Sequence, residues 1–204
     1  MKEDVSILNL GSGKVVPLDL HDYRSYFLVN LDSGYYDGVQ PSEVFSLFET
    51  WVTERPLMNI KSSRTLFVKE DAFNFLEKYQ LVFDKIVIYR FLEHIPKKSI
   101  LYFIYLLACS LKRGGVVDCI VPNYNVLAGR ILKEDPFDKD FEAEDIITTY
   151  ELLNEPESPH CSIWTPARIR KFFMLEKRFS VVEIDNRFVF DGRDIYLRAL
   201  LERI

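Results

Sequence analysis

The sequence predicts an α/β fold: an open, doubly wound sheet of seven strands that is mostly parallel and contains one antiparallel strand. Two observations support this fold class. Short, almost wholly apolar runs alternate with segments of helical periodicity, which is typical of parallel strands covered on both faces by helices. The last two runs are joined only by residues 186–194, which have no helical pattern, and so short a connection predicts an antiparallel pair.

The strands are expected where apolar, β-branched and aromatic residues run together. These runs are residues 5–10, 27–31, 65–68, 83–89, 116–121, 181–185 and 195–201. Only residues 14–26, with Pro17 among them, separate the first two runs. Because a parallel crossover needs about a dozen residues, a full helix is not expected in this link.

Helical spacing of apolar residues predicts the helices. They are expected at residues 72–79, 98–112 and 166–176, with a further one from Pro41, where Ser42 is a candidate N-cap. The helix at 98–112 is expected to end at Gly114-Gly115, and its apolar surface predicts burial in the core. An interface between copies of the chain is the alternative explanation for that surface. Residues 126–160 are less regular.

Length and composition indicate a single domain spanning residues 1–204. The chain has 204 residues, 48% of them apolar and 28% charged, which excludes a disordered or fibrous protein. The apolar stretch 100–111 is too short to cross a bilayer, and the charged start is unlike a signal peptide. Three widely spaced cysteines predict neither a disulfide framework nor a metal site, so we expect a cytoplasmic protein without a metal: Cys109, Cys119 and Cys161.

The acidic residues are concentrated in one segment. The net charge is −5, but residues 134–157 contain ten acidic residues and one basic residue and so carry −9, which leaves +4 elsewhere. We expect an acidic insertion at about residues 125–165, either a solvated loop or a lid above the active site. Its charge would repel phosphates, which argues against a nucleic-acid partner.

Small and polar residues follow the expected strands at the edge where open parallel sheets bind ligands. Glycines admit a ligand close to the backbone, and an acidic residue ending the second strand can accept hydrogen bonds from ribose hydroxyls. The first strand is followed by Gly11-Ser12-Gly13, the second by Asp32-Ser33, the third by Asp71-Ala72-Phe73 and the fourth by Arg90-Phe91-Leu92-Glu93-His94.

Three cofactors compete for this edge. The NAD fingerprint requires a third glycine, where Val16 stands, and a helix N-terminus for the pyrophosphate. The P-loop requires Gly-Lys followed by Ser or Thr, whereas Val15 follows Gly13-Lys14. S-adenosylmethionine carries no phosphate and needs no helix dipole, so these residues suit it best.

The ordered segments resemble class I S-adenosylmethionine-dependent methyltransferases, in particular a compact branch with a reduced first helix. The resemblance covers residues 5–123 and implies a Rossmann-like methyltransferase fold. It rests on Ile7-Leu8-Asn9-Leu10-Gly11-Ser12-Gly13, Val29-Asn30-Leu31-Asp32, Phe83-Asp84-Lys85-Ile86-Val87, Leu92-Glu93-His94-Ile95, Leu111-Lys112-Arg113-Gly114-Gly115 and Val121-Pro122-Asn123.

The resemblance also implies roles for individual residues. Gly11 and Gly13 would flank the methionine part of the cofactor, and Asp32 would bind the ribose hydroxyls. Asp71 would meet the adenine amino group, with Ala72 and Phe73 beside the ring, while Arg90 and Phe91 would lie near the sulfonium. Asn9, Ser12 and Ser33 complete the expected cofactor-binding set.

Structural explanations compete with these roles. The two glycines could form only a tight turn, Asp32 could start a turn, and Asp71 could be a helix N-cap. His94 and His160 are the candidate general bases for an oxygen or nitrogen nucleophile. His94 could equally be a structural residue that orders the loop of Glu93.

The resemblance predicts a methyltransferase that acts on a small molecule or glycan by O- or N-methylation. Two positions depart from the family pattern: Asn9 stands where an acidic residue is common, and Arg113 replaces the proline before the paired glycines. They motivate the alternative, a catalytically inactive methyltransferase-like binding or assembly protein. A nucleic-acid methyltransferase is disfavoured because no Asp/Asn-Pro-Pro-aromatic segment follows the fourth strand.

Overall fold

The fold is described from a computed structural model of the chain. It describes residues 4–11, 17, 20–33, 43–44, 46–48, 63–80, 82–132, 161–190 and 192–204. Four of the expectations above fall outside these residues: Ser12 and Gly13 as cofactor contacts, Ser42 as an N-cap, His160 as a base, and the acidic segment at residues 134–157.

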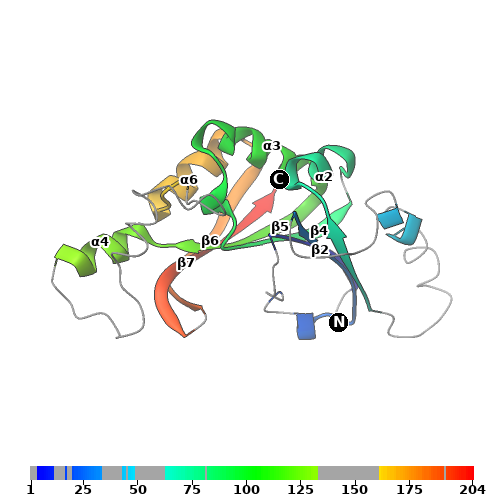
Figure 1. Cartoon of the computed structure of the whole chain (residues 1–204), viewed down its shortest axis with the longest axis horizontal. Coiled ribbons are helices and arrows are strands. Elements are labelled where there is room, and N and C mark those ends of the chain that lie inside the picture. The colour runs from blue at the N-terminus through cyan, green and yellow to red at the C-terminus, as the bar shows by residue number, and fades with distance from the viewer. Residues whose placement is uncertain are drawn as a thin grey trace.

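A seven-stranded sheet in the order β3-β2-β1-β4-β5-β7-β6 forms the centre of the molecule (Figure 1). Its first five strands are parallel, and β7 runs antiparallel to both of its neighbours. The predicted fold class is therefore confirmed. The strands are β1 (Asp4–Leu10), β2 (Ser25–Asp32), β3 (Arg64–Lys69), β4 (Phe83–Tyr89), β5 (Leu111–Pro122), β6 (Phe179–Phe190) and β7 (Arg193–Arg203).

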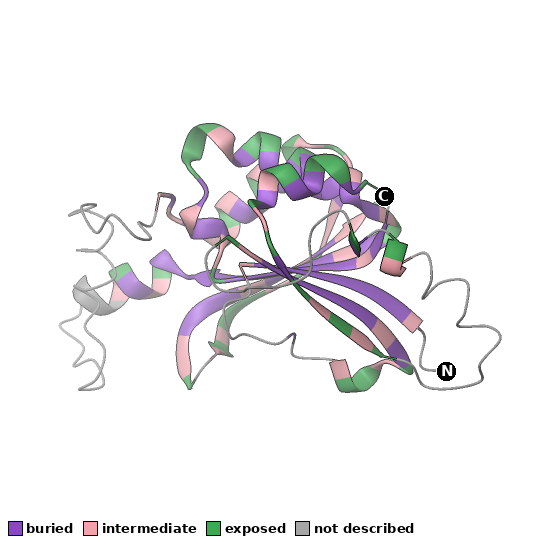
Figure 2. Ribbon diagram, turned by 45° about the vertical axis from the view of Figure 1, so that its right-hand side comes forward, coloured by how far each residue is buried: buried purple, intermediate pink, exposed green. Residues whose placement is uncertain are grey.

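Three helices lie together on one face of the sheet: α2 (Ala72–Lys78), α3 (Ile100–Ser110) and α6 (Pro166–Leu175) (Figure 1). Their apolar sides join the main core, while their outer sides are largely exposed (Figure 2). The opposite face is packed by a second cluster that includes Ile7, Leu28 and Val87 from the strands and Leu127 from α4 (Tyr124–Leu132). No helix in the described part of the chain is long and apolar enough to cross a membrane.

The end of α3 differs from the prediction. The helix stops at Ser110, not at the Gly114-Gly115 pair, because Leu111 is already extended and pairs with Phe83 of β4. The glycines lie inside β5, where a Cβ on Gly115 would come within 2.8 Å of the Lys112 carbonyl and 3.0 Å of the Asp84 carbonyl. Gly115 therefore allows the close approach of β4 and β5, while Gly114 has a left-handed φ of +78°, and neither residue caps the helix.

Helix α4 occupies the start of the region predicted to be irregular. Asn123 begins it, because its Oδ1 accepts the Asn125 backbone N–H at 3.2 Å and its carbonyl accepts those of Val126 and Leu127. Tyr124 and Leu127 are buried beneath it.

Candidate functional site

The ends of β1, β2 and β4 lie side by side at the carboxyl edge of the sheet. In the register, Leu10 pairs with Leu31 of β2 and with Ile88 of β4. The Gly11 N–H donates to the Leu31 carbonyl at 2.9 Å and so holds the turn after β1 against the end of β2. This edge includes the point where the strand order reverses between β1 and β4, which is where open α/β sheets bind ligands.

Gly11 is in direct contact with the loop after β4. Its φ is +61°, and a Cβ at this position would lie 2.2 Å from a ring carbon of Phe91. Both facts require glycine here. The structure therefore joins Gly11 and Phe91, two of the residues expected to bind the cofactor, and it also shows that packing alone accounts for the glycine. A cofactor contact of Gly11 is still a prediction.

Arg90 directly follows β4 and has a strained conformation. Its φ is 54°, a left-handed value that is uncommon for a residue other than glycine, asparagine or aspartate. Its N–H nevertheless donates to the Ile120 carbonyl of β5 at 2.8 Å, and its side chain is exposed at the edge. Strain of this kind concentrates at active sites and ligand clamps. A contact of Arg90 with the cofactor is still a prediction.

Asp71 caps α2, as the structural alternative predicted. Its Oδ1 accepts the N–H groups of Phe73 at 3.0 Å and Asn74 at 3.1 Å, which leaves Oδ2 for another donor. The Phe73 ring packs on α3, 6.2 Å from the Tyr102 ring and 5.4 Å from the Phe103 ring. Ala72 is buried beneath them. Contacts of these residues with adenine are still predictions.

Asp32 and Asn9 lie at different depths. Asp32 is half-buried at the end of β2, and exposed Ser33 follows it. Asn9 is 1% exposed, and its amide Nδ2 donates to Oδ1 of Asn30 at 2.9 Å across the β1–β2 pair. Asn9 thus contributes to a buried hydrogen bond between strands, whereas Asp32 lies where a ribose could reach it.

The short helix η2 (Leu92–His94) follows Arg90 and Phe91. The His94 N–H donates to the Phe91 carbonyl at 3.0 Å, and the residue is half-buried. This position is adjacent to the edge, and the role of His94 as a base is still a prediction.

Glu93 lies beside the candidate site but is not among the site residues predicted from the sequence. It is 1% exposed, and neither carboxyl oxygen meets a hydrogen-bond donor in the described part of the chain. Burial raises the pKa of Glu93 from 4.5 to about 8, against the opposing effects of its own backbone N–H and the charge of Arg90. Its flanking residues Leu92 and Ile95 are apolar and buried, which is the sequence signal that could have indicated it.

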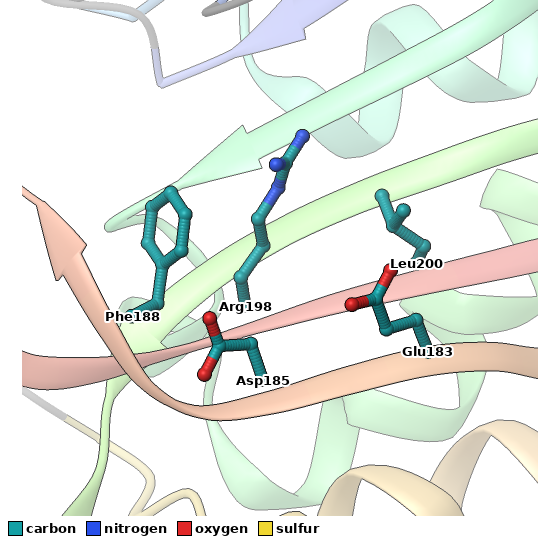
Figure 3. Close-up of a pocket in the computed structure, with 5 residues that line it drawn as sticks. All are labelled: Glu183, Asp185, Phe188, Arg198 and Leu200. Atoms are coloured by element: carbon teal, nitrogen blue, oxygen red, sulfur yellow. The ribbon is translucent and has the colours of Figure 1, made fainter.

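A small surface pocket lies away from this edge, on β6 and β7 (Figure 3). It is lined by Glu183, Asp185, Phe188, Arg198 and Leu200 and has an open volume of about 250 Å³. The Arg198 guanidinium lies over the Phe188 ring, 5.3 Å from its centroid, and is hydrogen-bonded to Asp118 of β5. The pocket lies on β6 and β7, beyond β5 from β4, so we do not assign it to the candidate site.

The residues at the edge fit a ligand that contains adenosine and no phosphate. The Asp32 carboxylate ends β2, and Asp71 follows β3 with an Oδ2 that accepts no hydrogen bond among the described residues. The short turn η1 (Leu20–Asp22) lies in the described part of the β1–β2 link. This donor set matches the sequence-based choice of S-adenosylmethionine.

No protein-family model matches the chain, and no curated protein matches its sequence. Solved structures do. A methyltransferase dependent on S-adenosylmethionine from Methanosarcina mazei is 18% identical, with a TM-score of 0.63 over 100% of this chain and 94% of that one. Another from Mesorhizobium loti is 14% identical, with a TM-score of 0.57 over 98% and 92%.

A third similar structure is the Burkholderia thailandensis 1,6-didemethyltoxoflavin N1-methyltransferase, bound to that substrate and S-adenosylhomocysteine. It is 13% identical, with a TM-score of 0.56 over 98% of this chain and 72% of that one. At such identities the likeness concerns the backbone alone. The chain has the fold of class I S-adenosylmethionine-dependent methyltransferases.

Proposed function

We propose that the chain is an S-adenosylmethionine-dependent methyltransferase that acts on a small molecule or glycan by O- or N-methylation. The observation that carries this proposal is the meeting of Gly11, Asp32 and Arg90–Phe91 at one edge, at the switch point between β1 and β4. The fold and the phosphate-free donor set support it. A cytoplasmic setting and a homo-oligomer formed through α3 are parts of the same proposal.

The cofactor would supply a methyl group activated by a sulfonium. The chain's own residues would bind and orient: Asp32 would accept hydrogen bonds from the ribose hydroxyls, and Oδ2 of Asp71 would accept one from the adenine amino group. His94, in the short helix after Arg90 and Phe91, would take a proton from the acceptor. Most of the rate would then come from positioning the acceptor in line with the methyl group.

Calorimetry with S-adenosylhomocysteine tests the proposal. We expect saturable binding to the wild-type chain, and its collapse in Asp32→Ala. Asp185→Ala is the matched control, because it removes an exposed carboxylate on β6 and should leave binding unchanged. Absence of binding to the wild-type chain at millimolar ligand would refute the proposal.

The alternative is an inactive methyltransferase-like binding protein. Asn9 favours it, since its amide is hydrogen-bonded to Asn30 and carries no charge for a cationic cofactor. If a partner protein bound equally well with and without S-adenosylhomocysteine, and Asp32→Ala changed neither interaction, this alternative would replace the enzyme.

A further inference from the structure

Glu93 has an environment that a charged carboxylate does not tolerate. Both of its oxygens lack donors among the described residues, and the residue is 1% exposed, as buried as the nearby Leu92 and Ile95. An ionised carboxylate without hydrogen bonds is costly to bury. Because burial raises the pKa of Glu93 to about 8, the neutral acid is the resident form at pH 7.

The ionisable groups that face Glu93 do not offset this cost. The charge of Arg90, just after β4, lowers the pKa of Glu93, but its effect is smaller than the effect of burial, which raises that pKa. Cys119 of β5 is a buried thiol whose pKa is raised by burial and, next, by the charge of Glu93. Cys161 is the ionisable residue of the segment that packs against η2.

The backbone of Glu93 holds that segment, residues 161–165. Its carbonyl accepts the N–H groups of Cys161 at 2.7 Å and Ser162 at 3.0 Å. The Ser162 hydroxyl donates to the Leu92 carbonyl at 3.2 Å and accepts the indole N–H of Trp164 at 2.9 Å. These contacts join the loop after β4 to a segment about 70 positions later in the chain.

The same segment reaches the loop after β5. The Trp164 carbonyl accepts the Tyr124 N–H at 3.1 Å, at the first residue of α4, and the Trp164 side chain is fully buried. Thr165 then caps α6, because its hydroxyl accepts the Arg168 N–H at 3.2 Å. Residues 161–165 therefore connect the two loops that would border the acceptor side of the proposed site.

We propose that Glu93 is a positioning residue: its backbone carbonyl keeps residues 161–165 docked between the loop after β4 and the start of α4 while its buried carboxyl is neutral, and ionisation of that carboxyl moves Glu93 and releases them. The docking itself stands without the proposed function. Only its consequence for ligand binding rests on that function. Glu93 touches no reacting atom in this scheme.

The test uses the indole N–H signal of Trp164 in the ¹⁵N-labelled chain, assigned with Trp51→Phe, which removes the only other tryptophan. In the wild type we expect the hydrogen-bonded shift to persist up to pH 7 and to move towards that of a free indole with a midpoint near 8. In Glu93→Gln, which stays neutral, the shift should not move. Glu183→Gln, an exposed glutamate on β6, should behave as the wild type.

Ser162→Ala provides a second variant that does not alter the carboxyl. It removes the acceptor of the Trp164 indole and should give the released shift already at pH 6. A transition that persists in Glu93→Gln, or a wild type without a transition up to pH 9.5, would overturn the proposal.

Binding of S-adenosylhomocysteine separates this proposal from the proposed function. One pH unit above the midpoint, about nine-tenths of the carboxyl is ionised, so wild-type affinity should fall about tenfold while that of Glu93→Gln stays flat. A chain that binds no S-adenosylhomocysteine but shows the indole transition, lost in Glu93→Gln, refutes the methyltransferase and supports the positioning role. A chain that binds S-adenosylhomocysteine but shows no indole transition supports the proposed function and refutes the positioning role of Glu93.

Discussion

Two buried carboxyl groups, one on β5 and one just after β4, have opposite surroundings. Asp118 is fully buried and accepts hydrogen bonds from Arg198 at 2.7 and 2.8 Å, Tyr89 at 2.8 Å and Lys85 at 2.9 Å. Burial raises the pKa of Asp118, but the bonds from Arg198 and the charge of Lys85 outweigh it and lower the pKa. Glu93 is 1% exposed, its carboxyl oxygens meet no donor among the described residues, and burial raises its pKa.

The difference separates a structural region from a candidate functional one. The hydrogen bonds of Asp118 connect the paired strands β4, β5 and β7, and its negative charge is balanced by Lys85 and Arg198. The edge near Gly11 combines Arg90 in a left-handed conformation, a glycine whose Cβ position is occupied by the Phe91 ring, and Glu93, whose carboxyl meets no donor among the described residues. Departures from locally favourable chemistry gather at functional sites, and here they gather where the fold binds ligands.

The largest effect is expected from Asp118→Asn. The amide leaves the buried ammonium of Lys85, whose side chain is 8% exposed, without its counter-ion. Breaking a buried ion pair from one side costs about 3–5 kcal/mol of unfolding free energy, which urea denaturation would measure. Asp185→Asn, an exposed carboxylate on β6, should change it by less than about 0.5 kcal/mol. Equal effects in the two variants would show that the network does not stabilise the chain.

Gly11→Ala should follow in size. It forces an alanine into a φ of +61° and drives its Cβ against Phe91, so we expect a loss of about 2–4 kcal/mol and weaker binding of S-adenosylhomocysteine. Gly114→Ala is the matched control, since its φ is +78° but its Cβ would meet nothing within 4 Å. It should lose only the backbone part, about 1–2 kcal/mol. A control as unstable as Gly11→Ala would remove the argument from Phe91.

Glu93→Gln should change how stability depends on pH. Folding raises the pKa of Glu93 from 4.5 to about 8, so between these values the native state keeps a proton that the unfolded chain gives up. The unfolding free energy contributed by this group therefore falls as pH rises, by about 1.4 kcal/mol per unit. Urea denaturation at pH 5.5, 6.5 and 7.5 should show Glu93→Gln gaining on the wild type at that rate. A constant difference would contradict the raised pKa.

The sequence predicted the sheet well because the burial of parallel strands is a local property. Residues 83–89 are apolar enough to be recognised without their neighbours, and the predicted bounds match β4. The end of α3 was missed because it depends on the pairing of Leu111 with Phe83, far along the chain.

The candidate site could be predicted only in part, for a related reason. Gly11 and Arg90 follow their strands directly and Asp32 ends its own strand, so the order of strands brings them to one edge. The environment of Glu93 depends on the docking of Ser162, which is 69 positions away. Asp118 and Lys85 were visible as charges inside apolar runs, but their pairing needed the register of β4 with β5.

The smallest change in stability, and the sharpest separation of the two regions, is expected from replacing left-handed residues by glycine. Arg90 has φ 54° and Lys177, before β6, has φ 60°. Relief of about 1–2 kcal/mol of strain is offset by about 0.5–1 kcal/mol of glycine entropy, so Arg90→Gly and Lys177→Gly should both unfold within about 1 kcal/mol of the wild type. Only Arg90→Gly should change the affinity for S-adenosylhomocysteine in calorimetry. Equal affinities would mean that the strain at Arg90 belongs to the β4–β5 connection and not to the ligand.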